Sequence, residues 1–189
     1  MISKHCDDHR TGNRFVKVLT STRFIVEKLK DDGIFPNNEK LPLIIYKKAL
    51  NLPGHDPASA IEALFEANLW RAAWRNGIYP FHHYHSTAHE VLGVYSGDAT
   101  VQLGGEKGVV SAISRSDVIV IPAGVSHKNL GSSLDFRVVG GYPQGQDWDM
   151  NEGRPGERPQ TDNRIAAVPL PPADPVYGRQ GPLVSHWLT

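Results

Sequence analysis

The sequence predicts an all-β protein, folded as a sandwich or small barrel of short strands. Between residues 79 and 142, apolar and β-branched runs recur at short intervals, separated by glycine-containing breaks at Ser96-Gly-Asp98 and Gly104-Gly105. A well-signalled helix occurs only once, ahead of this region, so repeated strand–helix units are not expected. The length of 189 residues is typical of one domain and can bury a core without cross-links.

The first residues are polar and charged, and we expect residues 1–13 to form a disordered tail. This segment contains His5, Cys6 and His9, which are residue types that can bind metals. Termini are poorly ordered unless other contacts hold them, so these three residues are expected to be incidental.

The barrel is expected to span residues 14–142 and to begin with two strands. Arg23–Leu29 partly alternates between apolar and polar residues, and Leu43–Tyr46 is a short apolar run. Turns are predicted between them at Asp31-Asp-Gly33 and Pro36-Asn-Asn38, because these residue types favour turn conformations.

One α-helix is predicted at residues 56–76. Asp56 can cap its N-terminus, Pro57 suits the first helical position, and Asn76-Gly77 is a typical helix end. The apolar side chains between them form a broad face, so we expect this helix to pack and to do no chemistry. The face consists of Ile61, Leu64, Phe65, Leu69 and Ala72, with Trp70 and Trp74 along a second apolar edge.

Six further strands are predicted up to residue 142, and an irregular arm after it. Eight of the 14 prolines fall in the last 47 residues, and proline interrupts helices and strands. Apolar residues still occur there, so residues 143–189 are expected to pack on the barrel or on a partner subunit. The strands are Phe81–His85, Glu90–Tyr95, Ala99–Leu103, Gly108–Ile113, Asp117–Ile121 and Asp135–Val139.

Composition excludes several classes of partner. The chain has 20 Lys and Arg against 20 Asp and Glu, so no overall field attracts nucleic acid or anionic lipid. No apolar run is long enough to span a membrane, and the N-terminus lacks the apolar core of a secretion signal. The single cysteine permits no internal disulfide. We therefore expect a cytoplasmic protein that binds neither nucleic acid nor membranes.

Four of the nine histidines lie within one stretch of eight residues. Successive side chains on a strand point to opposite faces, so His83 and His85 should share one face. His82 and Tyr84 should point to the other face. Two imidazoles on one face could bind the same metal ion.

Two more side chains can reach the same interior. A turn at Ser86–His89 would let Glu90 open the next strand and return its carboxylate beside the two imidazoles. Further along the chain, the strand Asp117–Ile121 runs into the tight turn Pro122-Ala-Gly-Val-Ser-His127, which can deliver another imidazole. The candidate site is therefore three histidines and one glutamate.

This spacing resembles the two sequence motifs of the cupins. Gly77-x5-His83-x-His85-x4-Glu90-x6-Gly97 resembles the first motif, and Pro122-x-Gly124-x2-His127 resembles the core of the second. The resemblance implies a double-stranded β-helix, or jelly-roll barrel. It also implies that one divalent metal is bound by His83, His85, Glu90 and His127.

The sequence departs from the second motif at two places. Ser116 stands where the motif usually has glycine, and Gly131 stands where it usually has asparagine. Neither position is a ligand, so the departures affect the expected turn geometry and not the metal site.

Longer stretches are similar to one bacterial group, the YjlB-like cupins, over roughly residues 24–187. This family has no assigned reaction, so the resemblance implies the fold and leaves the substrate open. The similar stretches are His83-Tyr-His-Ser-Thr-Ala-His-Glu-Val-Leu-Gly93, Asp31-Asp-Gly33, Pro36-Asn-Asn38, Leu41-Pro-Leu43 and Asp174-Pro-Val-Tyr-Gly178.

Other readings of the histidines stay open at this point. His85 and His89 are four residues apart, a familiar zinc-binding spacing on a helix. His89 could also replace Glu90 as the fourth ligand of a barrel site. The remaining histidines, His55 and His186, are expected at the surface or in packing contacts.

The expected function is that of a metal-binding cupin, either an enzyme or a binding protein. Imidazole and carboxylate ligands suit Mn, Fe, Ni, Co or Zn, and four of them leave positions open for a substrate or O2. An enzyme would use the metal as a Lewis acid or O2-activating centre, as a dioxygenase, oxidase, isomerase or decarboxylase acting on a small oxygen-rich or carboxylate substrate. The alternatives are a non-catalytic protein that binds a small anion or sugar, and a purely structural metal. A homodimer is expected, because exposed sheet edges need cover.

Overall fold

The computed structural model describes residues 17–19 and 23–188. The predicted tail at 1–13, with its two histidines and cysteine, lies outside these residues. The helices are α1 (Pro57–Ala67), α2 (Gln160–Ala167) and α3 (Pro182–Trp187), and no helix in the described ranges is long and apolar enough to cross a membrane. The strands are β1 (Lys17–Val18), β2 (Arg23–Leu29), β3 (Asn38–Lys47), β4 (Leu50–Asn51), β5 (Trp70–Asn76), β6 (Glu90–Ser96), β7 (Asp98–Leu103), β8 (Val109–Ser114), β9 (Val118–Ile121), β10 (His127–Ser132) and β11 (Arg137–Pro143).

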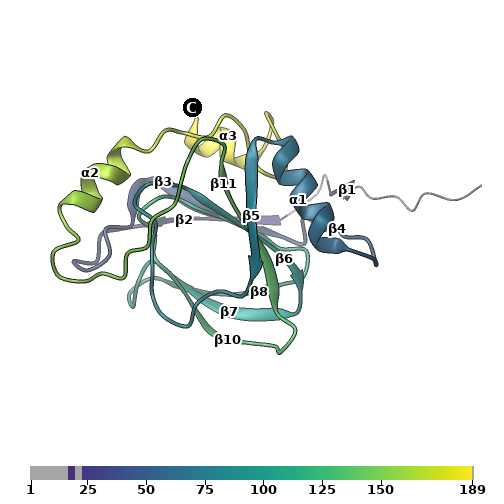
Figure 1. Ribbon diagram of the computed structural model, residues 1–189, viewed down its shortest axis with the longest axis horizontal. Coiled ribbons are helices and arrows are strands. Elements are labelled where there is room, and N and C mark those ends of the chain that lie inside the picture. Colours follow the sequence, from purple (N-terminus) through teal and green to yellow (C-terminus); the bar gives the residue numbers. More distant parts are fainter. Residues whose placement is uncertain (1–16, 20–22, 189) are drawn as a thin grey trace, which may run out of the picture.

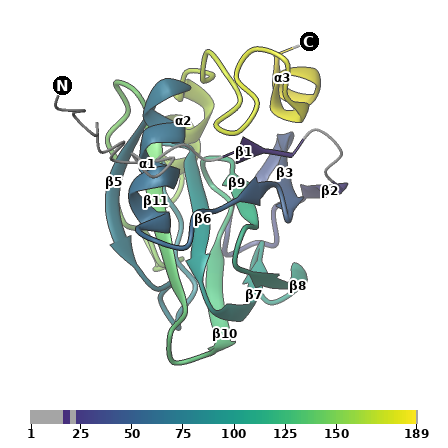
Figure 2. The ribbon, with the colours of Figure 1, turned by 90° about the vertical axis from the view of Figure 1, so that its right-hand side faces the viewer.

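The strands form a barrel of two antiparallel sheets. The larger sheet has the order β2-β3-β9-β6-β11-β5, and the smaller sheet has the order β10-β7-β8. The smaller sheet lies along one side of the barrel, whereas the chain after β11 lies on the opposite side (Figures 1 and 2). The fold is thus the all-β double-stranded β-helix that the sequence predicts.

Both faces of the larger sheet are buried at its centre, which explains the apolar runs Leu43–Tyr46 in β3 and Val118–Ile121 in β9. In β3, Leu43 and Ile45 point into the barrel, whereas Ile44 and Tyr46 point to the outer layer. The four residues of β9 divide between the two layers in the same alternating way. Helix α1 and the C-terminal chain cover the outer layer, so these strands have no solvent-facing side.

The predicted helix at 56–76 is wrong in its second half. Helix α1 ends at Ala67, and Leu69 adopts a left-handed conformation with a φ of 65°, which ends the helical path. The next residues form β5 and pair with β11 at the edge of the larger sheet. The cross-strand pairing available at this edge overrides the helical spacing of the apolar residues.

The strand prediction is confirmed for β2, β3, β6, β7, β8, β9 and β11, with shifted ends. The predicted strand Phe81–His85 is corrected to two isolated bridges, at His83 and Tyr84. These residues pair with two different partners, His127 and Asn151, so no continuous ladder forms. Strand β10, which begins at His127, is not among the predicted strands.

The chain after β11 forms the C-terminal arm, residues 144–188, which packs on the outer face of its own barrel. Val176, Leu183 and Trp187 are buried in one cluster with side chains of β3, β6 and β9. The indole N–H of Trp187 donates to the Pro42 carbonyl at 2.9 Å, and that of Trp70 donates to the Ala173 carbonyl at 2.9 Å. The arm is therefore held by apolar burial and by directed hydrogen bonds.

Candidate metal centre

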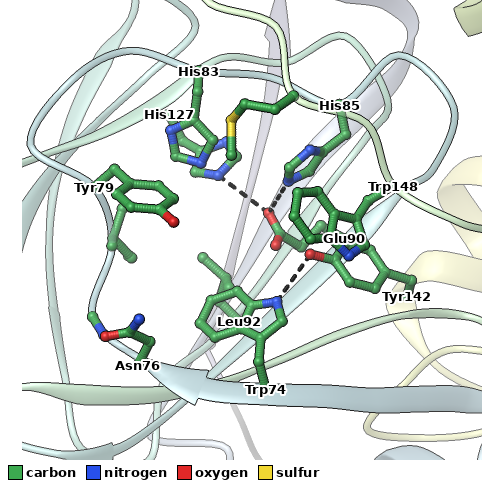
Figure 3. A pocket seen from close by; sticks show the side chains of 13 residues that line it. Trp74, Asn76, Tyr79, His83, His85, Glu90, Leu92, His127, Tyr142 and Trp148 are labelled. Carbon is green, nitrogen blue, oxygen red and sulfur yellow. Dashed lines mark hydrogen bonds and ion pairs between the residues drawn. The ribbon is translucent and has the colours of Figure 1, made fainter.

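The four predicted ligand side chains converge inside the barrel (Figure 3). His83 and His127 lie on adjacent segments whose backbones exchange two hydrogen bonds, of 3.2 and 2.9 Å. His85 follows on the same face as His83, and Glu90 is the first residue of β6. One ring nitrogen from each of the three histidines lies within 4.8 Å of the other two, and all four side chains are buried.

A glycine turn sets the position of His127. Gly124 has a φ of 91° and donates its N–H to the His85 carbonyl at 2.8 Å. A Cβ atom at this residue would lie 2.4 Å from the Asn37 carbonyl oxygen, so only glycine fits. Ser116, at the other motif departure, also has a positive φ, of 79°, so it adopts the backbone conformation that glycine favours.

Backbone carbonyls determine which nitrogen each imidazole presents to the cavity. The Nδ1 atom of His83 lies 3.3 Å from the Phe81 carbonyl, and that of His127 lies 3.4 Å from the Val125 carbonyl. Nδ1 of His85 is hydrogen bonded to the Asp149 carbonyl. A carbonyl oxygen can only accept, so Nδ1 carries the hydrogen in each ring. In the neutral rings Nε2 is then an unprotonated acceptor, which is the form that binds a metal.

The Glu90 carboxylate adds a fourth electron-rich group. Its Oε2 atom lies 3.2 Å from Nε2 of His127 and 3.5 Å from Nε2 of His85. The same atom is fully buried and has no hydrogen-bond donor among the described residues. Burial alone would raise the pKa of this carboxyl and lower that of His85, but their mutual attraction reverses both shifts.

These donors fit a bound cation. Unprotonated imidazole nitrogens and a carboxylate oxygen repel one another at these distances unless positive charge lies between them. A proton on His85 could supply that charge for one pair, whereas a divalent metal could contact all four side chains. Burial holds the pKa of His83 at about 3, so this ring stays neutral and available as a ligand. The three buried histidines can hold a metal ion.

The C-terminal arm orients one of these histidines. Asp149 of the arm accepts a hydrogen bond from His85 through its backbone carbonyl. Its carboxylate accepts two more from Ser86, one from the backbone N–H at 2.6 Å and one from the hydroxyl. Arg164 of α2 lies 3.5 Å from the same carboxylate. Asp149 is therefore a positioning residue for His85, and sequence spacing gave no sign of it because the two lie 64 positions apart.

The neighbouring histidines have other roles. His82 and Tyr84 point to the opposite face, as strand alternation predicts, and both contact Phe35. His89 is buried against Trp187, and its Nδ1 accepts the N–H of Ala123 at 2.9 Å. Its packing against the arm places it outside the group of three histidine nitrogens. His55 and His186 are exposed.

A cavity of about 230 Å³ opens beside the histidines, and its other walls include four aromatic side chains. Sequence reasoning missed these residues. Trp74 was assigned to the helix, and the Pro-rich arm gave no periodicity from which to place Trp148. The aromatic residues are Trp74, Tyr79, Tyr142 and Trp148, and Ile78, Leu92 and Met150 add apolar surface.

A β-bulge directs Trp74 into this cavity. Strands β5 and β11 pair in regular register except between Gly140 and Gly141. The register shifts there, so Ala73 has no cross-strand partner on β11. A bulge reverses the side-chain alternation beyond it. Trp70 and Ala72 accordingly pack in the outer layer, whereas Trp74 packs against the inner one.

Trp74 also fixes a hydroxyl group at the cavity wall. Its indole N–H donates to the Tyr142 hydroxyl oxygen at 2.9 Å, as Figure 3 shows. Burial and the nearby Glu90 charge raise the pKa of Tyr142, so its phenol keeps its proton. With its oxygen already accepting from Trp74, the phenol can direct that proton to the Glu90 carboxylate or to a ligand.

Comparison with known proteins places the chain in a family. It is 41% identical over 158 residues to the protein named "Uncharacterized protein YjlB" of Bacillus subtilis strain 168, covering 84% of this chain and 93% of that one. No protein-family model matches. Among solved structures, the chain is similar to an uncharacterized conserved protein with a double-stranded β-helix domain from Klebsiella pneumoniae. The two are 12% identical, the match covers 80% of this chain and 99% of that one, and the TM-score is 0.31.

Procruciferin, an 11S globulin from Brassica napus, gives a TM-score of 0.35 at 16% identity, covering 69% of this chain and 27% of that longer one. Such low TM-scores support no functional comparison. The family assignment rests instead on the sequence match to the Bacillus subtilis protein, which covers most of this chain and nearly the whole of the relative. The chain belongs to the YjlB-like family of cupins.

Proposed function

We propose that this protein is a metal-dependent enzyme whose His83, His85, His127 and Glu90 side chains hold one divalent transition metal. The observation that carries the proposal is a group of three buried imidazoles, with ring nitrogens within 4.8 Å of one another, beside a buried Glu90 oxygen that has no hydrogen bond among the described residues. Imidazole and carboxylate ligands suit Mn, Fe, Co, Ni and Zn alike, so the donor set does not select one of them.

The chemistry that such a metal supplies is Lewis acidity, or activation of O2, toward a small oxygen-rich or carboxylate substrate. The protein contributes three neutral imidazoles and one carboxylate, so a divalent ion retains one net positive charge. That charge attracts an anionic or oxygen donor from the cavity. The Tyr142 hydroxyl, held by Trp74, is a fixed hydrogen-bond donor at the same wall.

An enzymatic role is supported by the open space beside the ligands. A purely structural metal is normally enclosed by protein ligands on all sides. Here a cavity of about 230 Å³ reaches all three histidines and Glu90. A substrate can therefore approach the metal directly.

The metal site is tested by elemental analysis. The purified protein is dialysed with each of the five metals and then against metal-free buffer, beside a His83→Ala/His127→Ala variant. We expect one metal ion per chain in the wild-type protein and almost none in the variant, with circular dichroism showing that both remain folded. Equal metal content in the two proteins would contradict this set of ligands.

Catalysis is tested separately on the metal-loaded protein. Small hydroxy acids and hydroxylated compounds are screened with an oxygen electrode and by NMR, and turnover that disappears in the double variant is the expected result. Stoichiometric binding without turnover would identify a small-molecule-binding protein instead. Unfolding of His85→Ala would indicate a structural metal.

The proposal also includes a cytoplasmic homodimer. The larger sheet leaves β2 and β5 as edge strands, and edge strands without cover favour pairing between chains. Light scattering coupled to size-exclusion chromatography measures the mass directly. A mass of one chain at micromolar concentration would contradict the dimer.

A further inference from the structure

The cavity beside the metal-binding histidines has walls suited to a flat, apolar ligand. The rings of Tyr142 and Trp148 are nearly parallel, at 19°, with centroids 6.1 Å apart. Trp74 and Tyr79 line other parts of the cavity. Aromatic walls favour planar rings, which they contact by stacking or edge-to-face packing.

The walls offer no positive charge for a second anionic group. None of the described residues that line the cavity is a lysine or arginine. Arg71 is near enough for its charge to act on the Tyr142 phenol. Its guanidinium nevertheless pairs with Asp147 at 2.9 Å and does not line the cavity. One anionic group would neutralise the net positive charge of the loaded metal centre. A second one would be buried without a partner, which is unfavourable.

The walls also offer few partners for hydroxyl groups. Apart from the histidines and Glu90, the polar lining groups are Asn76 and the polar tips of the aromatic residues, of which the Trp74 N–H is already used. A sugar carries several hydroxyls, each of which needs a partner when buried. The cavity volume of about 230 Å³ corresponds to roughly eight water molecules of ~30 Å³ each, which limits the ligand to about one ring.

The apolar surface continues at the mouth of the cavity. Tyr79 is stacked on Phe81 with centroids 5.0 Å apart, and both rings are partly exposed. Trp148 and Met150 of the C-terminal arm are also exposed beside the cavity. An apolar ring substituent that extends out of the cavity would meet these side chains.

We infer that the ligand of this site is a single-ring aromatic compound whose oxygen donors, a carboxylate or adjacent hydroxyls, lie together on one edge of the ring. That edge contacts the metal and the Tyr142 hydroxyl, while the ring packs between Trp74, Tyr142 and Trp148. The inference rests on the proposed metal site, which supplies the charge for the donor edge.

Ligand binding is measured by calorimetry on the metal-loaded protein, with tryptophan fluorescence as a second readout. Trp74 and Trp148 line the cavity, whereas Trp70 and Trp187 are buried in the outer layer, so quenching reports on the cavity. The probes share a hydroxy-acid group. Salicylate has a ring, lactate has none, gluconate has a polyol body, and hydroxyterephthalate carries a second carboxylate on the ring.

Salicylate is expected to bind at least about tenfold more tightly than each of the other three probes. Trp148→Ala should reduce that preference by roughly tenfold while leaving lactate binding unchanged. Phe24→Ala removes an exposed aromatic side chain of β2 outside the cavity and should have no effect.

Metal content is measured again after each titration, which separates the two possible failures. If the protein holds its metal but binds salicylate no better than lactate or gluconate, the aromatic ligand class is overturned and the metal site stands. If the protein binds no metal, the proposed function fails, and the inference that depends on it fails as well.

Discussion

At the scale of single residues, the position of three hydrogen atoms determines what this cavity can bind. Carbonyls of Phe81, Val125 and Asp149 hold the Nδ1 hydrogens of the three histidines, and each Nε2 lone pair is left facing the others. The carbonyls belong to backbone that is itself fixed by the His83–His127 bridge and by the arm. The ligand orientation is thus a product of the fold and does not depend on a metal to create it.

Substitution of His127, compared with substitution of the neighbouring non-ligand His82, tests the proposed set of ligands. His127→Ala should weaken metal binding by more than about 100-fold. Even substitution of a residue that only hydrogen bonds to a metal ligand lowers metal affinity by roughly 10- to 100-fold. His82→Ala, next to a ligand but on the opposite face, should change metal affinity little. Competition with a chromogenic chelator measures both variants.

The fourth ligand is tested in the same assay. Glu90→Gln should lower the affinity, because it removes the negative charge that lies 3.2 and 3.5 Å from two imidazole nitrogens. His89→Ala should retain the metal while losing its contact with Trp187. The opposite pattern would make His89 the fourth ligand and would overturn the assignment of Glu90.

Acid should release the metal. Burial lowers the pKa of His85, but Glu90 and Asp149 together more than offset it and raise that pKa, whereas burial lowers the pKa of His83 to about 3. A proton on His85 therefore competes first, and affinity should already begin to fall above about pH 6.5, the reference value for histidine, and continue to fall below it. Equilibrium dialysis at several pH values measures the decline. Metal content that is unchanged at about pH 5 would show that no imidazole must lose a proton to bind it.

At the scale of secondary-structure elements, the difference between α1 and β5 shows where sequence reasoning stops. The apolar positions from Ile61 to Trp74 fit a helix throughout, and the helical pattern is real as far as Ala67. What ends the helix is the left-handed Leu69 and the availability of β11 as a pairing partner, which is a tertiary effect. The bulge opposite Gly140 and Gly141 could not be predicted either, although it places Trp74 in the cavity.

The metal-site residues were easier to predict than the cavity walls. His83, His85 and Glu90 lie close in sequence. Alternation gives the common face of the two histidines, and the turn before Glu90 returns its carboxylate beside them. His127 lies far along the chain, and the tight turn that begins at Pro122 predicted its approach, which the resemblance to the second cupin motif supported. Trp148 and Asp149 reach the site through the path of the arm, which has no regular period from which their positions could be inferred. Tyr142 lies near the end of β11, beyond the end of the predicted strand at Val139.

Asp174 anchors the arm, and its loss should be costly. Its buried carboxylate accepts the Tyr46 hydroxyl and the backbone N–H groups of Val176, Tyr177 and Leu183. Asp174→Ala leaves these donors buried without an acceptor. We expect the free energy of unfolding to fall by roughly 3–5 kcal/mol in a urea titration.

The matched control is Asp147→Ala. The Asp147 side chain is 90% exposed and pairs with Arg71 at the surface. Its removal should change the free energy of unfolding by no more than about 0.5 kcal/mol. A similar loss in both variants would mean that the buried carboxylate does not anchor the arm.

At the scale of the whole molecule, the protein should fold without its metal. Its two large hydrophobic clusters are built from apolar side chains of the two sheets, α1 and the C-terminal arm, and their burial stabilises the fold independently of a metal. Metal binding should then add stability by mass action, by about 2.7 kcal/mol at a concentration 100 times the dissociation constant. For a chain of this size that corresponds to a rise in Tm of roughly 5–10 °C.

Differential scanning fluorimetry with the metal and with a chelator measures this shift. The chelator-treated protein should still show one cooperative transition. A metal-free chain without such a transition would mean that the metal is required for folding, as in a structural site.

The position of Trp148 and Met150 on the arm has an evolutionary consequence. The proposed metal ligands lie on the barrel, between residues 83 and 127, whereas part of the cavity mouth is formed by a segment that lies after the last strand. If the proposed metal site is functional, mutations at the mouth can change which ligand is accepted without altering the proposed metal ligands. Relatives that share all four of these residues can therefore differ in the ligand that they accept. The residues at the cavity mouth should be compared before the reaction of one relative is assigned to another.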